Sequence, residues 1–107
     1  MPYVNTREDV FSFLQTEMPK LQRDFGITKM ALFGSFAKGT QTETSDVDLL
    51  IESSQSLGLK FFELSDYLEN GLGRKIDLIT FRQMEESKKK LRYKAIAENV
   101  ERSLLYV

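Results

Sequence analysis

The chain has 107 residues, of which 41% are hydrophobic and 29% charged, with a formal net charge of −1 and no cysteine or histidine. This ordinary globular composition predicts one domain spanning residues 1–107. The two missing residue types exclude disulfide bonds, thiolate nucleophiles, Ser-His-Asp triads and the usual zinc sites. Any chemistry in the chain must therefore use carboxylates, hydroxyls, basic side chains and hard cations.

Charge is balanced over the whole chain but uneven along it. The segment from Arg82 to Lys94 is basic, and the segment from Glu43 to Asp77 is acidic. Because the net charge is close to zero, the sequence does not predict direct binding to nucleic acid. It also lacks a long apolar segment or a basic N-terminus followed by one, so we expect a cytoplasmic protein without membrane contact.

A helix followed by a strand is predicted for the first third of the chain. Thr6 can cap a helix that begins at Arg7, and apolar residues recur at three- and four-residue spacing up to Gly26, which suits the helix end. Pro19 should kink or restart this helix. The β-type run Ile27 to Phe33 follows and stops at a glycine.

The rest of the chain alternates between strands and helices. We predict a turn containing one helical turn, a buried strand, a helix that ends at Asn70 and Gly71, a third strand, and a final helix or pair of helices. Their ranges are Gly34 to Ser45, Asp46 to Ile51, Leu57 to Leu72, Lys75 to Phe81 and Glu85 to Tyr106. The order α-β-β-α-β-α predicts an α/β fold with a small mixed sheet flanked by helices.

Three aspartates are candidates for a metal site. Asp46 and Asp48 stand two residues apart on the second predicted strand, so both side chains project from the same face. Asp77 lies in the apolar frame of the third predicted strand. Neighbouring carboxylates repel one another when ionised, and a divalent cation held by oxygen ligands is the usual compensation. Three acids at adjacent strand ends can hold two Mg²⁺ ions for a phosphoryl displacement, although an isolated Asp-x-Asp pair is more often a pair of surface acids.

A glycine turn precedes the acidic pair. Gly34 and Ser35 follow the first predicted strand and offer backbone N–H groups and a hydroxyl to a triphosphate. Lys38 in this turn and Arg74 before the third strand are further candidates for contact with a nucleotide. The alternative for these two side chains is that they are simply exposed to solvent and contact no nucleotide.

Two other phosphate or metal motifs are excluded by single positions. A P-loop requires Lys followed by Ser or Thr after its second glycine, and Thr40 and Gln41 stand there instead. An EF-hand calcium loop requires glycine and glutamate where this chain has Ile51 and Leu57.

The segment KMALFGSFAKGTQTETSDVDLLIE resembles the signature of polymerase-β-type nucleotidyltransferases, and in particular of their minimal branch. Members of that superfamily share Gly-Ser, a spacer of this length, Asp-x-Asp on a strand and a carboxylate on the following strand. The resemblance implies that Gly34 and Ser35 bind the phosphates of ATP. It implies equally that Asp46 and Asp48 bind two Mg²⁺ ions and that Asp77 completes the catalytic metal site.

The resemblance also implies a reaction and a partner. Minimal nucleotidyltransferases pair with helical HEPN proteins, and several such pairs are toxin-antitoxin systems. The chain would then transfer AMP from ATP to a hydroxyl of a HEPN toxin, a tyrosine in the studied pairs, and act as the antitoxin. We expect another protein to present the acceptor, and a second copy of the chain is a further candidate partner.

Two alternatives to this function stay open. In the first, the chain would be a non-enzymatic antitoxin module that binds nucleotide or covers the toxin. In the second, it would be a nucleotidyltransferase that acts on a small molecule or an RNA end. No residue in the sequence decides between them.

Overall fold

The computed structural model describes residues 4–102 and 104–107. Its elements are α1 (Arg7–Phe25), β1 (Ile27–Phe33), α2 (Gly34–Lys38), β2 (Val47–Ser53), α3 (Lys60–Leu72), β3 (Ile76–Thr80), α4 (Phe81–Lys88), α5 (Leu91–Arg102) and β4 (Leu105–Tyr106). The four strands form one sheet in the order β3-β2-β1-β4. β2 runs antiparallel to β1 and parallel to β3, so the predicted mixed sheet is confirmed.

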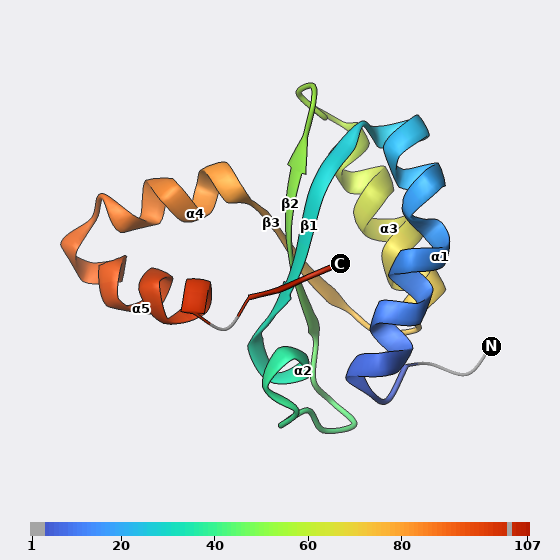
Figure 1. Ribbon diagram of the computed structural model, residues 1–107. Helices are drawn as coiled ribbons and strands as arrows, with labels where there is room; N and C mark the ends of the chain where they lie inside the picture. Colours follow the sequence, from blue (N-terminus) through green and yellow to red (C-terminus); the bar gives the residue numbers. More distant parts are fainter. Residues whose placement is uncertain (1–3, 103) are drawn as a thin grey trace.

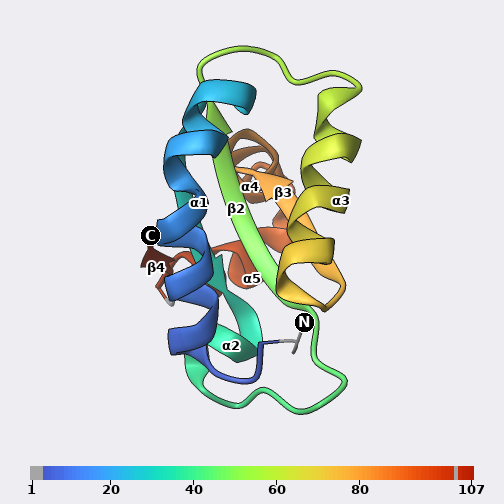
Figure 2. The ribbon, with the colours of Figure 1, turned by 90° about the vertical axis from the view of Figure 1, so that its right-hand side faces the viewer.

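Helices cover both faces of the sheet. α1 and α3 lie side by side on one face, whereas the α4–α5 hairpin projects from the other (Figure 1). The view turned by 90° shows α1 and α3 in front of β2, with α4 and α5 behind it (Figure 2). The α/β fold expected from the sequence is confirmed.

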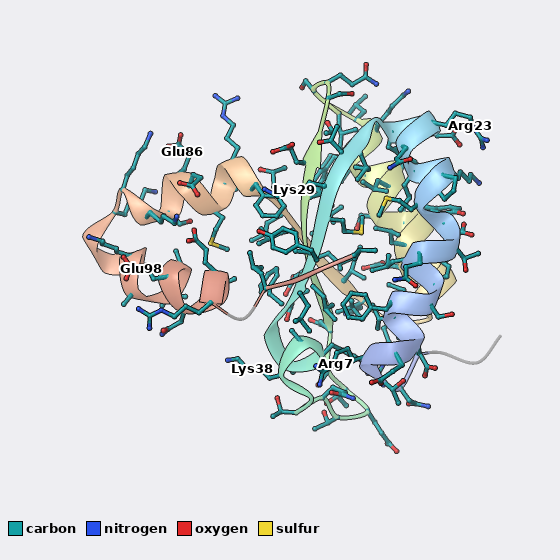
Figure 3. The ribbon with its side chains drawn as sticks, in the orientation of Figure 1. Arg7, Arg23, Lys29, Lys38, Glu86 and Glu98 are labelled. Carbon is teal, nitrogen blue, oxygen red and sulfur yellow. The ribbon has the colours of Figure 1, made fainter. Side chains whose placement is uncertain are left out.

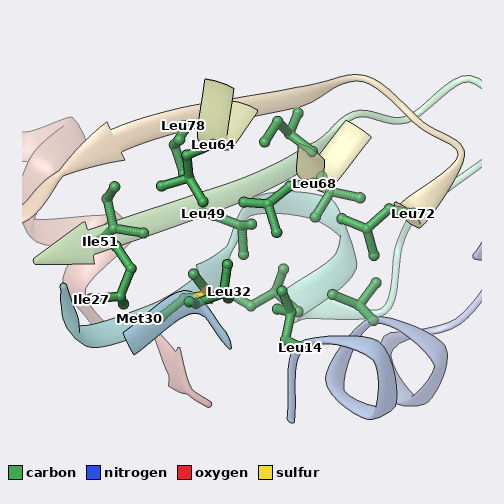
Figure 4. Packing of buried hydrophobic residues seen from close by; sticks show 14 of the residues in the cluster. Leu14, Ile27, Met30, Leu32, Leu49, Ile51, Leu64, Leu68, Leu72 and Leu78 are labelled. Carbon is green, nitrogen blue, oxygen red and sulfur yellow. The ribbon is translucent and has the colours of Figure 1, made fainter. Parts of the chain in front are cut away.

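Alternation along β2 decides where its polar side chains point. Val47, Leu49 and Ile51 are buried in the main core between the sheet and the helices α1 and α3. Figure 4 shows Leu49 and Ile51 in this core. Leu50 packs in a second, smaller cluster on the face of the α4–α5 hairpin. Because successive strand residues alternate between faces, Asp48 shares the face of Leu50 and points away from the main core.

The boundaries of α1 follow from its caps. Thr6 and Asp9 form a capping box, and Gly26 ends the helix in the left-handed conformation with φ of 66°. The expected restart at Pro19 is wrong, because one helix runs through this residue. Proline removes a single backbone hydrogen bond, and the buried stripe of α1 continues on both sides of it, from Leu14 to Leu21.

The predicted last residue of α3, Leu72, is confirmed, but its expected termination by Asn70 and Gly71 is wrong, and the helix begins at Lys60 instead of Leu57. The helix continues to Leu72, and Gly73 caps it in the left-handed conformation with φ of 70°. Gly71 is needed for another reason, because a Cβ atom at this position would lie 2.1 Å from Cζ of Phe13 on α1. Gly71 therefore permits the close contact between the two helices.

We expect Gly71→Ala to lower the free energy of unfolding by about 1–3 kcal/mol, the range for overfilling a packed contact. Urea denaturation measures this loss. The exposed neighbour supplies the control, since Asn70→Ala should change stability by no more than about 0.5 kcal/mol. Equal effects of the two substitutions would contradict a packing role for Gly71.

The pair of helices predicted for the C-terminal part is confirmed as α4 and α5, but its predicted bounds, Glu85 to Tyr106, are wrong at both ends. α4 begins earlier, at Phe81, because Thr80 and Gln83 form a capping box directly after β3. The chain then ends in β4, which pairs antiparallel with β1. A strand of two residues is too short for a hydrophobic pattern to predict. No helix in the described part of the chain has both the length and the apolar character to cross a membrane.

Candidate active site

The Gly-Ser turn is packed directly against one of the candidate metal ligands. Gly34 follows β1, opens α2 and has φ of 74°, a conformation that favours glycine. A Cβ atom at Gly34 would lie only 2.0 Å from Oδ2 of Asp48. The turn can therefore approach the Asp48 carboxylate this closely only because residue 34 has no side chain.

Strand register brings two of the three aspartates together. Phe33 at the end of β1 is paired with Asp48, and Asp48 is paired with Asp77 on β3. Asp48 is half-buried and Asp77 is exposed. The two carboxylates therefore stand next to each other on adjacent parallel strands, on the sheet face of the α4–α5 hairpin.

Crowding of these carboxylates changes the acidity of Asp48. Burial, a hydrogen bond with Asp77 and the charges of Asp77 and Asp46 together raise the pKa of its carboxyl group from 3.8 to about 7, and burial is the largest of these causes. The hydrogen bond needs a proton on one of the two carboxyl groups. A divalent cation can replace that proton and neutralise both carboxylates, so the donor set fits a hard metal ion such as Mg²⁺.

Asp46 is placed differently from the other two acids. It lies exposed in the loop just before β2 and acts on Asp48 through its charge. Within residues 4–102 and 104–107, no three acidic side chains are gathered tightly enough to form a complete cation site. The structure thus brings Asp48 and Asp77 together and leaves Asp46 at the rim, where the metal role predicted for it stays a prediction.

Comparison with known families decides where the chain belongs. A family model described as a nucleotidyltransferase domain matches residues 18–104, which include the Gly-Ser turn and all three aspartates. The chain belongs to this nucleotidyltransferase family. The resemblance inferred from the sequence is confirmed.

Curated relatives narrow the group to MntA-like protein adenylyltransferases. The nucleotidyltransferase is 37% identical over 103 residues to the protein adenylyltransferase MntA of Thermococcus cleftensis, covering 95% of this chain and 96% of that protein. It is 31% identical over 74 residues to the protein adenylyltransferase MntA of Shewanella oneidensis, covering 68% of this chain and 49% of that protein.

Solved structures share the fold. One of a protein assigned as a minimal nucleotidyltransferase matches with a TM-score of 0.69 and 27% identity, over 94% of this chain and 95% of that one. A second, of a toxin-antitoxin with AMP-PNP, matches with a TM-score of 0.56 and 28% identity, over 69% of this chain and 64% of that one.

The two basic side chains predicted to contact the nucleotide, Lys38 and Arg74, occupy contrasting positions in this nucleotidyltransferase. Lys38 is exposed on α2, the helix that begins with Gly34 and Ser35, and lies beside the turn with its amine in solvent (Figure 3). Arg74 is buried, and its guanidinium donates to backbone carbonyls of the loop before β2. Sequence reasoning placed Arg74 near the site and missed these loop contacts, because no local pattern signals them.

Proposed function

We propose that the chain transfers AMP from ATP to a side-chain hydroxyl of a HEPN toxin, with Mg²⁺, and thereby acts as its antitoxin. The observation that carries the proposal is the Asp48–Asp77 pair, closed on one side by Gly34. The named activity of its relatives supports AMP transfer to protein. The likeness to a toxin-antitoxin with AMP-PNP supports both the partner and an adenine nucleotide triphosphate.

Each part of the proposed site has a separate task. Backbone N–H groups and the hydroxyl at Gly34 and Ser35 bind the phosphates, and Lys38 adds a positive charge beside them. Asp48 and Asp77 would hold Mg²⁺, with Asp46 joining them from the loop. Mg²⁺ bound there would stabilise the negative charge that develops on the phosphoryl oxygens.

The proposed reaction is an in-line displacement at the α-phosphorus. The acceptor oxygen forms a bond to this phosphorus while the bond from the α-phosphorus to the bridging oxygen breaks, and pyrophosphate leaves with that oxygen. The proton of the acceptor hydroxyl passes to the Asp77 carboxylate, which faces solvent and is open to an incoming partner. Catalysis then depends on positioning and electrostatics, without a covalent enzyme intermediate.

Labelled ATP tests this function directly. The chain is incubated with its HEPN partner and ATP labelled at the α-phosphate, and transfer is compared with the Asp46→Asn/Asp48→Asn variant. Wild type should label the partner and the variant should not. Equal labelling by both proteins would refute the assignment of these acids. In a parallel screen with added small molecules and RNA, pyrophosphate release without labelled protein would indicate one of these as the acceptor.

The non-enzymatic alternative makes the opposite prediction in cells. An antitoxin that only covers the toxin would still protect when both aspartates are replaced by asparagine, because asparagine keeps the size and shape of each side chain. An AMP-transferring antitoxin would lose protection. Co-expression with the toxin and a growth measurement separate the two.

A further inference from the structure

Arg74 is the one charged side chain that is buried among the residues the structure describes, with 9% of its surface exposed. Its Nε donates to the carbonyl of Val4 at 2.6 Å. Its Nη1 donates to three carbonyls of the loop before β2, those of Ser45, Thr42 and Glu43, at 2.9, 3.0 and 3.1 Å. A buried guanidinium is costly unless its donors are satisfied, so these contacts indicate a built arrangement.

The contacts of Arg74 join the separate segments that carry the candidate site. Its guanidinium carbon lies 5.1 Å from the ring centre of Phe36, on the short helix that Gly34 opens. The carbonyl of Ser45 belongs to the residue directly before Asp46. Arg74 itself precedes β3, the strand of Asp77. One side chain therefore connects the phosphate-binding turn, the loop of Asp46 and the strand of the third carboxylate.

Backbone hydrogen bonds hold the two ends of the loop that carries Asp46: Thr40 N donates to the Ser35 carbonyl at 3.0 Å, and Val47 N donates to the Lys75 carbonyl at 3.0 Å. Thr42 N donates to Ser45 Oγ at 2.8 Å and Ser45 N donates to the Thr42 carbonyl at 3.2 Å, so these bonds shape the loop internally. Gln41 adds a hydrogen bond from its amide nitrogen to the Asn5 carbonyl at 3.1 Å. Between these two ends, the Arg74 guanidinium is bonded to three carbonyls of the loop, those of Thr42, Glu43 and Ser45.

We propose that Arg74 is a positioning residue that holds Asp46 in reach of Asp48 and Asp77 and so sets the affinity of the site for a divalent cation. This inference rests on the proposed function, because it takes Asp46 as a cation ligand. It replaces the expectation that Arg74 contacts the nucleotide. Its Nη1 donates to the loop carbonyls, while Nε and Nη2 donate to Val4 and Asn5, so Arg74 acts on the cation through the backbone of the loop.

Mn²⁺ binding tests the inference without an acceptor protein. Free Mn²⁺ is measured by electron paramagnetic resonance in the presence of AMP-PNP, for wild type, Arg74→Met and Arg74→Lys. Hydrogen-deuterium exchange of residues 41–47 is measured on the same proteins. Ile27→Ala is the control, since it removes core volume at the opposite end of β1 without touching the loop.

We expect Arg74→Met to weaken Mn²⁺ binding at least tenfold and to speed exchange of the loop. Arg74→Lys should give intermediate values of both measurements. Lysine keeps the charge, but it is one bond shorter and lacks the planar set of N–H donors of the guanidinium. Ile27→Ala should leave both measurements near wild type. Wild-type Mn²⁺ affinity in both Arg74 variants, or an equal loss in Ile27→Ala, would overturn the positioning role.

Two further outcomes separate this role from neighbouring hypotheses. If Arg74 touched the nucleotide, Arg74→Met would weaken AMP-PNP binding without metal and leave loop exchange unchanged, which would refute positioning. If wild type transfers no AMP while Arg74→Met still loses Mn²⁺ affinity, the proposed function fails and the positioning role stands. If wild type transfers AMP and Arg74→Met binds Mn²⁺ normally, the reverse holds.

Discussion

Replacing Asp48 by asparagine should reduce AMP transfer by at least about a hundredfold, the scale for losing one preorganised electrostatic contact to a transition state. The same change should make the metal-free protein more stable at pH 8. Asparagine has nearly the shape of aspartate but carries no charge, and its amide can donate to the Asp77 carboxylate. The substitution therefore removes the repulsion within the pair and keeps its hydrogen bond.

The direction of the pH dependence follows from the raised pKa of Asp48. Its carboxyl group has a pKa of about 7 in the folded chain against an ordinary value of 3.8, so the folded state holds the extra proton between these values. The stability contributed by this proton is fully present below pH 3.8 and is lost as the pH rises through about 7. Without metal, wild type should lose stability over this range more steeply than Asp48→Asn.

Thermal unfolding in EDTA at pH 5 and pH 8 measures this difference, and a Mg²⁺ titration completes the test. Mg²⁺ should raise the Tm of wild type more at pH 8 than at pH 5, because it replaces the proton, and should have little effect on Asp48→Asn. Glu52→Gln is the control, since Glu52 is an exposed acid on the same strand as Asp48 but outside the carboxylate pair. A variant that is both inactive and less stable than wild type at pH 8 would contradict the repulsive pair.

The sequence predicts that Asp48 and Asp77 lie on adjacent strands, but the contact between them is seen only in the folded chain. The apolar frame around Asp77 predicts its place on a strand, and the parallel register of β2 and β3 places it directly beside Asp48. Register is a property of two strands together, so the pattern of either strand alone does not contain it. A local cap such as that at Thr6 made a helix boundary predictable, whereas Gly71 was taken for a helix end because its contact with Phe13 on α1 exists only in the fold.

Arg74 marks the limit of sequence reasoning at the site. Its nearness to Asp77 in the sequence suggested a nucleotide contact, whereas its hydrogen bonds reach residues about 30 positions earlier in the chain. Burial of a charged side chain depends on acceptors that only the folded chain gathers. No spacing rule relates an arginine before one strand to the carbonyls before another.

The second large effect is expected at Gly34. Gly34→Ala should abolish most AMP transfer, because the added Cβ atom would lie 2.0 Å from Oδ2 of Asp48 and either the turn or the carboxylate must move. A misplaced reacting group costs about a hundredfold in rate even for displacements near 1 Å. Stability should fall too, by about 1–2 kcal/mol for the left-handed backbone and by a further amount for the clash.

The variant Gly58→Ala distinguishes the cost of the left-handed backbone from the cost of the steric clash. Gly58 also has a positive φ, of 54°, but a Cβ atom there would meet nothing within 4 Å. Gly58→Ala should therefore lose stability by the backbone cost alone and keep its activity.

The double variant Gly34→Ala/Asp48→Ala tests the clash itself. Removing the carboxylate that the new methyl group strikes should restore part of the stability lost in Gly34→Ala. Urea denaturation of Gly34→Ala, Asp48→Ala and the double variant measures this coupling. Strictly additive losses would mean that Gly34 is required for its backbone conformation alone, and that its contact with Asp48 does not restrict the turn.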